Sequence, residues 1–234
     1  MERPQFVNEC IYHIYNRGVE KRDIFLKDKD YLRFIVGLHE FNDRNPAFNL
    51  YRARNLFEVG LRTLRTRLKP QEPPVSIFAF CLMPNHYHLM LQQKMDNGIT
   101  EFMRKLGTGY TNYFNLKYNR VGPLFQGKFK AVLLEKEAHF LHLPHYIHLN
   151  PLDLKMPEWR NRKIKDIRKA IDFLERYRWS SLPDYLGMKN FASVIEKGFL
   201  TECIGTPKDF RSGMKEWITD LDFSTIQKIA IEEL

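Results

Sequence analysis

The stretch MPNHYHLML, residues 83–91, places two histidines, His86 and His88, two positions apart directly after a Pro-Asn pair. Pro84-Asn85 is a turn signal between apolar runs, so residues 75–93 predict two antiparallel strands joined by a hairpin turn. Residues i and i+2 of a strand point to the same face, so the two imidazoles should lie side by side, roughly 7 Å apart at Cβ. Two imidazoles can bind one divalent ion when another element supplies a third ligand. By itself, the triplet favours the alternative of two polar surface side chains.

A second motif, HYIHLNPL at residues 145–152, lies in a helical segment and places Tyr146 and Asn150 four residues apart on one helical face. A tyrosine hydroxyl can attack a phosphodiester if a metal ion polarises the phosphate and compensates for the phenol pKa of about 10. The amide oxygen of Asn150 could then be a metal ligand. The alternative is a core tyrosine and a helix-terminal asparagine before Pro151, and the motif by itself favours that alternative.

The order of the predicted elements indicates the fold class. Strands are expected at 9–18, within 75–93 on either side of the 83–85 turn, and at 122–135, and helices at 28–45, 98–120 and 136–150, with Pro144 interrupting the last helix. This β-α-β-β-α-β order predicts an α+β fold of the ferredoxin-like, split βαβ type. Its antiparallel sheet should be covered by helices on one face, and a helical C-terminal extension should follow.

The chain is expected to divide into three parts. Residues 1–152 form the first, with a basic insertion at about 46–72. Residues 153–190 form a basic extension, with an amphipathic helix expected at 160–178 and a loop after it. Residues 191–234 form an acidic helical tail.

The charge of the chain is unevenly distributed. It has 234 residues, 37 Lys and Arg against 28 Asp and Glu, and a net charge of +9. Residues 191–234 contain five basic and eight acidic residues, a net charge of −3, so the preceding 190 residues carry +12. A protein this basic usually binds a polyanion, most often nucleic acid, although a solvated basic surface is the alternative. Any polyanion should bind the body rather than the tail.

The cysteines and apolar runs indicate a cytoplasmic protein. The three cysteines are far apart and form no CxxC pair, as expected for reduced thiols. The first ten residues, MERPQFVNEC, lack the apolar core of a signal peptide. The apolar run at 77–83 is too short to span a membrane. We therefore expect no membrane partner.

Five motifs together resemble a known family. They are YHIYNRG (12–18), FCLMPNHYHLML (80–91), YTNYFNLKYNRVGPLFQGKFK (110–130), HYIHLNP (145–151) and WSSLPDYLG (179–187). In this order they resemble the HUH single-strand DNA endonucleases with one catalytic tyrosine, and more narrowly the REP-associated tyrosine transposases. The resemblance spans roughly residues 10–187. The HUH triplet alone is weakly specific, whereas the triplet, the tyrosine helix and their flanks together are strongly specific.

The resemblance implies a function and a set of site residues. Tyr146 corresponds to the nucleophile, His86 and His88 to the metal-binding pair, and Asn150 to the polar residue that completes the ion site. Such enzymes use Mg²⁺ or Mn²⁺, need no nucleotide cofactor, and act on single-stranded or hairpin DNA in transposition. The tyrosine forms a 5′-phosphotyrosine link and releases a 3′-hydroxyl, and the reverse attack rejoins strands.

The other histidines are interpreted separately. His13 is expected on a central strand, either next to the metal ligands as a supporting group or as a hydrogen-bonded core residue. Four histidines recur every three residues: His139, His142, His145 and His148. Solvated or DNA-facing side chains are favoured for them over a second metal site. Pro144 is expected to start a new helical segment and so fix the pose of Tyr146.

The DNA contacts are expected from basic and aromatic residues. Phosphates should be held by the basic residues of 160–178 and by Arg17, Arg52, Arg54, Arg62, Arg65, Lys128 and Lys130. Three tyrosines, Tyr110, Tyr113 and Tyr118, could stack on unpaired bases, although core packing is favoured for most of them. The protein is expected to be a monomer or a homodimer.

Two rival functions stay open. The chain could be a domesticated hairpin-binding protein that no longer cuts DNA, or a replication or conjugation nickase. The intact set of His86, His88, Tyr146 and Asn150 argues against the binder, which has no use for a nucleophile. The single tyrosine in its YIHLNP context disfavours the nickase.

Overall fold

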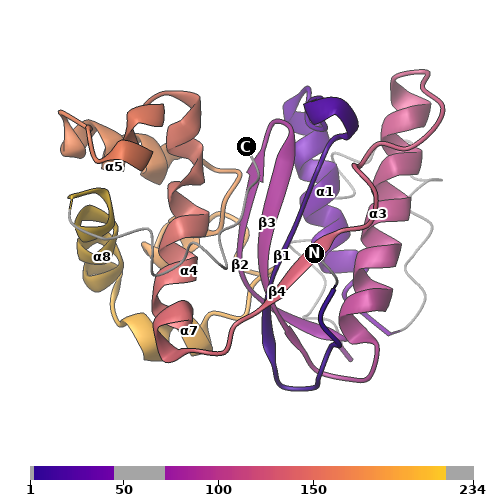
Figure 1. Ribbon diagram of the computed structural model, residues 1–234, viewed down its shortest axis with the longest axis horizontal. Coiled ribbons are helices and arrows are strands. Elements are labelled where there is room, and N and C mark those ends of the chain that lie inside the picture. The colour runs from indigo at the N-terminus through magenta and orange to yellow at the C-terminus, as the bar shows by residue number, and fades with distance from the viewer. Residues whose placement is uncertain (1–2, 45–71, 220–234) are drawn as a thin grey trace.

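The computed structural model describes residues 3–44 and 72–219 (Figure 1). Its strands are β1 (Ile11–Arg17), β2 (Val75–Met83), β3 (His86–Gln93) and β4 (Lys130–Leu133). Its α-helices are α1 (Asp28–Glu40), α3 (Gly98–Lys117), α4 (Glu137–Leu149), α5 (Ile167–Arg176), α6 (Leu182–Tyr185), α7 (Gly198–Ile204) and α8 (Pro207–Thr219). Short 3-10 turns lie at η1 (Val19–Lys21), η2 (Asn150–Leu154) and η3 (Pro157–Asn161).

The four strands form one sheet in the order β2-β3-β1-β4. Every neighbouring pair is antiparallel, so β1 and β2 run in the same direction with β3 between them. This is the order of a split βαβ unit. The predicted α+β, ferredoxin-like fold and its hairpin between β2 and β3 are confirmed.

Strand alternation gives the two faces of the sheet different chemistry. On β3, Tyr87 and Leu89 are buried on the side covered by α1 and α3, where Tyr87 packs against the Phe34 ring with centroids 5.0 Å apart. His86 and His88 point to the opposite side. Figure 1 shows α1 and α3 on one side of the sheet and α4, α5, α7 and α8 on the other. Helices therefore cover one face as predicted, while α4 and the extension cover the second.

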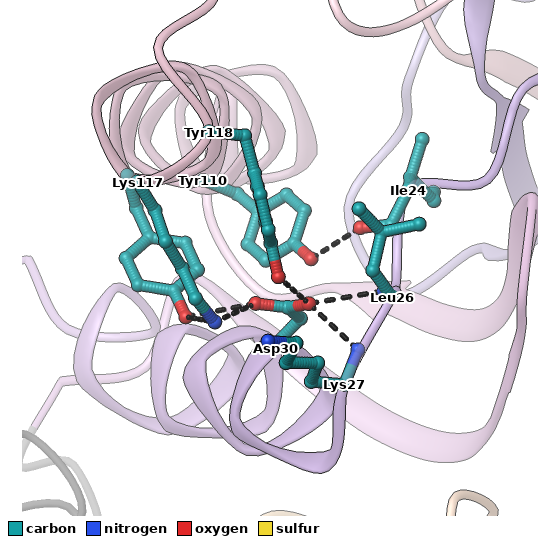
Figure 2. Close-up of polar contacts among 8 residues, drawn as sticks. Ile24, Leu26, Lys27, Asp30, Tyr110, Lys117 and Tyr118 are labelled. Atoms are coloured by element: carbon teal, nitrogen blue, oxygen red, sulfur yellow. Dashed lines mark hydrogen bonds and ion pairs between the residues drawn. The ribbon is translucent and has the colours of Figure 1, made fainter.

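A buried carboxylate ties the α1–α3 layer together (Figure 2). Asp30 accepts hydrogen bonds from the backbone N–H of Leu26 and Lys27. It also accepts bonds from three side chains near the C-terminus of α3: Tyr113, Lys117 and Tyr118. Burial raises the pKa of Asp30, but the hydrogen bonds from Lys117, Tyr118 and Tyr113 outweigh that effect and hold it below its usual value. The carboxylate therefore stays ionised and fixes the loop before α1, whose Ile24 and Phe25 bond to Pro84 beside His86.

The strand predicted at 122–135 is wrong in length. Only Lys130–Leu133 forms β4, and Phe125 makes an isolated bridge with Gly18. Gly122 and Gly127 have φ values of 87° and 72°, a left-handed conformation that interrupts an extended strand. Residues 122–129 therefore form a loop beside the end of β1.

The helix predicted at 160–178 is also shorter than expected. Arg162 adopts a left-handed conformation after η3, and α5 begins only at Ile167. The Asp166 side chain accepts a hydrogen bond from the Lys169 backbone N–H at 2.9 Å, which is an N-cap. This cap sets the start of α5.

The predicted interruption at Pro144 is wrong, because α4 runs continuously through it. Proline in a helix interior removes one backbone hydrogen bond and costs about 3 kcal/mol. Residues 143–149 are all buried, so their packing offsets that loss. Tyr146 is therefore placed by a continuous helix.

Residues beyond α4 pack back onto it and onto the sheet edge. Residues 179–181 lie along β2: Leu82 N–H donates to Trp179 O, and Ser181 N–H donates to Phe80 O. Helix α8 buries Phe210, Met214 and Trp217, and it contacts α4 and α5. The three-part division of the chain stays a prediction.

The predicted basic insertion at about 46–72 falls almost entirely outside the described residues, and so does the end of the acidic tail. Within the described ranges, no helix is both long and apolar enough to cross a membrane.

Candidate active site

The register of β1 and β3 places several polar side chains on the α4 side of the sheet. Tyr15 pairs with His88, and Arg17 pairs with His86. The His86 and His88 rings lie 5.1 Å apart at their centroids and nearly perpendicular, at 88°. The expectation that both imidazoles share one face is met.

Each imidazole is oriented through its Nδ1 atom. The His88 Nδ1 is 2.9 Å from His13 Nε2, and the His86 Nδ1 is 2.6 Å from Asn85 Oδ1. Where Nδ1 carries the proton, the lone pair of the ring lies on Nε2. Hydrogen bonding of the distal nitrogen is how proteins usually orient metal-binding histidines. His13 is buried and contacts His88 as the supporting role requires, although the same bond also fits a core histidine.

Tyr146 projects from α4 onto this face. Its ring meets His88 and His13 edge-on, with centroids 5.9 Å and 6.3 Å away. The side chain is 1% exposed. The tyrosine is therefore both a core residue and a neighbour of the histidines, and its burial must be relieved before a large substrate can reach the hydroxyl.

Asn150 is fully buried at the C-terminus of α4. Its Nδ2 donates to the Tyr146 carbonyl at 2.8 Å, and its Oδ1 accepts from Arg160 Nη2 at 3.3 Å. These two contacts fix which end of the amide is the oxygen. The amide oxygen is therefore oriented by the helix that carries Tyr146.

The donor set fits a divalent ion with mixed nitrogen and oxygen ligands. His86 and His88 offer Nε2 atoms on one face, and Asn150 offers an oriented oxygen from α4. In the described ranges, no group of three or more His, Cys, Asp or Glu side chains could hold a metal ion. Among the described residues, a metal site at His86 and His88 would therefore need a ligand of another type, such as an amide oxygen.

A pocket of about 580 Å³ opens on this face. The residues that line it are Tyr15, Asn16, Arg17, Lys21, Asp23, Met83, Pro84, Asn85, His86, Tyr87, His88, Gln126, Lys130, Asp153 and Leu154. Three of them, Arg17, Lys21 and Lys130, are basic and two, Asp23 and Asp153, are acidic, so the lining has a small excess of positive charge, which suits a ligand that carries negative charge.

The sequence analysis missed Asp153, and it expected Arg160 only as one of the basic residues of 160–178 that hold phosphates, not as a neighbour of Tyr146. Asp153 lines the pocket, and it forms an ion pair with Arg160 at 2.6 Å. The Arg160 Cζ lies 5.9 Å from the centroid of the Tyr146 ring. Both residues lie in 3-10 turns, which have no periodic pattern to mark a shared face. The only sequence signals for the pair are an Asp two residues after the HLNP motif and an Arg directly after Trp159.

The residues predicted to contact DNA have mixed placements. Arg17 lines the pocket and donates to Gln126, Lys130 lines the pocket, and Lys128 is exposed on the neighbouring loop. Four predicted arginines lie outside the described residues: Arg52, Arg54, Arg62 and Arg65.

The predicted base-stacking tyrosines serve the α1–α3 layer instead. Tyr110 is buried and donates to Ile24 O, and Tyr113 and Tyr118 donate to Asp30. The favoured reading, core packing, fits all three better than stacking on bases.

The histidine stripe of α4 is not solvated throughout. His145 packs beside Phe210 of α8, and burial lowers its pKa to about 4. The His148 Nε2 is 2.8 Å from Ser181 Oγ, and burial lowers the pKa of His148 to about 3. The interpretation of solvated or DNA-facing side chains is wrong for these two, because the extension covers them.

A comparison with known protein families matches the segment that contains the candidate site residues. Residues 65–150 match the family model described as "Transposase IS200 like", and this segment contains His86, His88, Tyr146 and Asn150. The matched part is well under half of the chain. The match agrees with the resemblance that the five sequence motifs indicate.

One solved structure aligns with most of this chain. A REP-associated tyrosine transposase bound to a REP hairpin aligns with 12% sequence identity and a TM-score of 0.47, covering 80% of this chain and 85% of that chain. No curated protein matches the sequence.

Proposed function

We propose that this protein is a metal-dependent DNA transposase that cleaves and rejoins single-stranded or hairpin DNA with Tyr146 as its nucleophile. The observation that carries the proposal is the packing of the Tyr146 ring against His88 and His13, on the sheet face that also presents His86. The family match over residues 65–150 supports the transposase class. The positive charge of the chain supports a DNA substrate.

The ion in this proposal is Mg²⁺ or Mn²⁺. His86 and His88 would hold it through Nε2, and Asn150 through Oδ1, with His13 orienting His88. A bound divalent ion polarises the phosphodiester and compensates for the high pKa of a phenol nucleophile.

The cleavage step needs no further reactant. The Tyr146 hydroxyl loses its proton and its oxygen forms a bond to phosphorus, while the bond from phosphorus to the 3′-oxygen breaks. The departing 3′-oxygen takes up a proton, which leaves a 5′-phosphotyrosine and a 3′-hydroxyl. The phosphate ester stays intact in the covalent link, so a 3′-hydroxyl can attack it in reverse and rejoin the strands.

The DNA backbone should be held at the rim of the pocket. Arg17 and Lys130 line it, and Lys128 lies on the adjacent loop. The exposed basic residues before and on α5 would extend this surface, together with the arginines predicted in the insertion. Each neutralised phosphate releases counterions, so binding should weaken steeply as salt rises.

The test is covalent capture. Labelled hairpin oligonucleotides are incubated with the full chain and Mn²⁺, and adducts that survive denaturing electrophoresis are counted. We expect an adduct that disappears in Tyr146→Phe, because phenylalanine cannot attack phosphorus, while hairpin binding persists. The control is Tyr87→Phe, since Tyr87 lies on the α1–α3 side of the sheet.

Two results would contradict the proposal in different ways. An adduct that persists in Tyr146→Phe would assign the nucleophile to another residue. Hairpin binding without any adduct from the natural chain would instead favour the binding protein that no longer cuts.

A further inference from the structure

Arg160 of η3 contacts two of the groups to which the proposed function gives roles. Its Cζ lies 5.9 Å from the centroid of the Tyr146 ring, and its Nη2 donates to Asn150 Oδ1 at 3.3 Å. One guanidinium therefore lies beside both the proposed nucleophile and the proposed oxygen ligand.

Asp153 holds this guanidinium in a fork. Arg160 Nε donates to Asp153 Oδ1 at 2.9 Å, and Arg160 Nη2 donates to Asp153 Oδ2 at 2.6 Å. Arginine binds carboxylates and phosphates with the same two-pronged geometry. A phosphodiester, with two non-bridging oxygens, is therefore a chemically equivalent partner for Arg160.

The pair lies where such a partner would arrive. Asp153 lines the pocket that His86 and His88 also line. The side chains of Arg160 and Asp153 are 23% and 24% exposed, whereas Tyr146, whose ring lies beside the Arg160 guanidinium, is 1% exposed. The pair can therefore open without disruption of the core, and opening it would uncover one side of Tyr146.

Trp159 provides Asp153 with a second partner. Its Nε1 donates to Asp153 Oδ1 at 2.6 Å, so the carboxylate keeps a hydrogen bond when the guanidinium leaves. The partly exposed position of Asp153 also lets water hydrate its charge. Release of Arg160 therefore does not leave a buried charge without compensation, which would be costly.

We propose that Arg160 is a phosphate-binding residue that Asp153 holds in reserve, and that an entering DNA phosphate replaces the Asp153 carboxylate as its partner. The exchange turns Arg160 toward the phosphate and opens the way to Tyr146. This inference rests on the proposed function. It breaks no covalent bond, and one ion pair replaces another.

Substitution of Asp153 should then strengthen DNA binding, whereas substitution of Arg160 should impair the reaction with DNA. Asp153 is negative and competes with phosphate for Arg160, so Asp153→Asn should tighten hairpin binding several-fold. Arg160→Ala removes a phosphate contact beside the nucleophile, so it should slow adduct formation at saturating DNA by about 10–100-fold, the loss expected for a charged hydrogen bond to the reacting group. Arg160→Lys keeps the charge without the fork and should be intermediate.

The experiment uses the full chain with Mn²⁺ and a labelled hairpin. The dissociation constant comes from fluorescence anisotropy, the adduct rate constant at saturating DNA from quenched time courses, and the melting temperature from calorimetry. Arg104→Ala is the matched control, because it removes an exposed guanidinium from α3, on the opposite side of the sheet from α4. It should leave the rate at saturating DNA unchanged.

The outcomes separate this inference from the proposed function. If Asp153→Asn weakens binding and slows the adduct in parallel with Arg160→Ala, the pair is only structural and the inference is overturned. A normal rate in Arg160→Lys with an unchanged melting temperature would also overturn it, because the fork would then be unnecessary. If the natural chain forms no adduct, the proposed function itself fails.

Discussion

Two polar clusters lie on opposite sides of one sheet and differ in how their charges are matched. The Asp30 carboxylate is fully buried and receives hydrogen bonds from two backbone N–H groups and three side chains (Figure 2). The Arg160 guanidinium on the other side is partly exposed and is shared between Asp153 and Asn150.

The difference separates a structural charge from one that can exchange partners. Donors from the loop before α1 and from the C-terminal end of α3 leave Asp30 a single arrangement, and any displacement would leave a buried charge unpaired. Arg160 can leave Asp153 because the Asp153 carboxylate keeps its hydrogen bond from Trp159 and can be hydrated by water. The first cluster can therefore hold the scaffold while the second adjusts to a ligand.

The strongest challenge to this contrast is Asp30→Ala. Removing one member of a buried, hydrogen-bonded ion pair costs about 3–5 kcal/mol of the free energy of unfolding. Urea unfolding should show a loss of this size. Asp28→Ala is the control, because Asp28 is exposed in the first turn of α1, where a carboxylate contributes about 0.3–1 kcal/mol. Equal losses in the two variants would show that the Asp30 cluster is not a structural anchor.

Acid should weaken the α4 side of the molecule before it affects Asp30. His145 and His148 have pKa values lowered by burial to about 4 and about 3, so the folded chain binds fewer protons than the unfolded chain below pH 6.5. Stability is therefore full above pH 6.5 and falls as pH drops toward 4, by about 3 kcal/mol for His145 alone at about 1.4 kcal/mol per pKa unit. The lowered pKa of Asp30 adds a loss only below its unfolded value of 3.8.

Urea midpoints measured between pH 7 and pH 4 test this dependence. The slope should become shallower in His145→Leu, which cannot take up a proton. His139→Leu is the control, since His139 is only partly buried and should change the slope much less. A flat profile in the natural chain would mean that these histidines are hydrated or accept protons at little cost.

A third prediction concerns the support of the proposed ion site. His13→Phe keeps a ring of similar size but removes the bond to His88 Nδ1, so Mn²⁺ affinity should fall about 10–100-fold. Titration calorimetry of the DNA-free protein measures this directly. Tyr12→Phe changes the adjacent residue on the other face of the sheet and should leave the affinity unaltered. Unchanged affinity in His13→Phe would make His13 an ordinary core histidine.

The smallest expected effect is that of one donor to Asp30. Tyr118→Phe removes the 2.7 Å bond to Asp30 Oδ2 and should cost about 1 kcal/mol, because four other donors remain. The same substitution made in the Asp30→Ala background should cost nearly nothing. A full loss in that background would place the contribution of Tyr118 in packing instead.

Strand alternation and turn chemistry made most of the sheet predictable. The His86–His88 spacing and the Pro84-Asn85 turn were sufficient for the hairpin and for the shared face, because the side-chain period of a strand is two. The length of β4 was overestimated, because residues 122–129, GPLFQGKF, contain two glycines and a proline, which disfavour a strand. Gly122 and Gly127 adopt positive φ before the strand, so β4 begins only at Lys130.

The candidate site was predictable only where it lies on periodic elements. Tyr146 and Asn150 are one helical turn apart on α4, so their proximity follows from spacing. Asp153 and Arg160 meet through two 3-10 turns, and residue spacing does not determine where such turns place a side chain. The burial of His145 and His148 was missed because it depends on how α8 and residues 179–185 return to α4.

Residues 179–181 also bear on self-association. They hydrogen bond to the outer edge of β2, whose unpaired backbone groups would otherwise be a template for a strand of another molecule. A chain that ends before Trp179 would expose this edge along an apolar strand and should form aggregates at concentrations where the full chain does not. A chain that ends at Asn190 keeps the edge covered. Residues 179–181 therefore cover the edge of the sheet and block the addition of a foreign strand. Shortened forms of the protein should be designed to retain them.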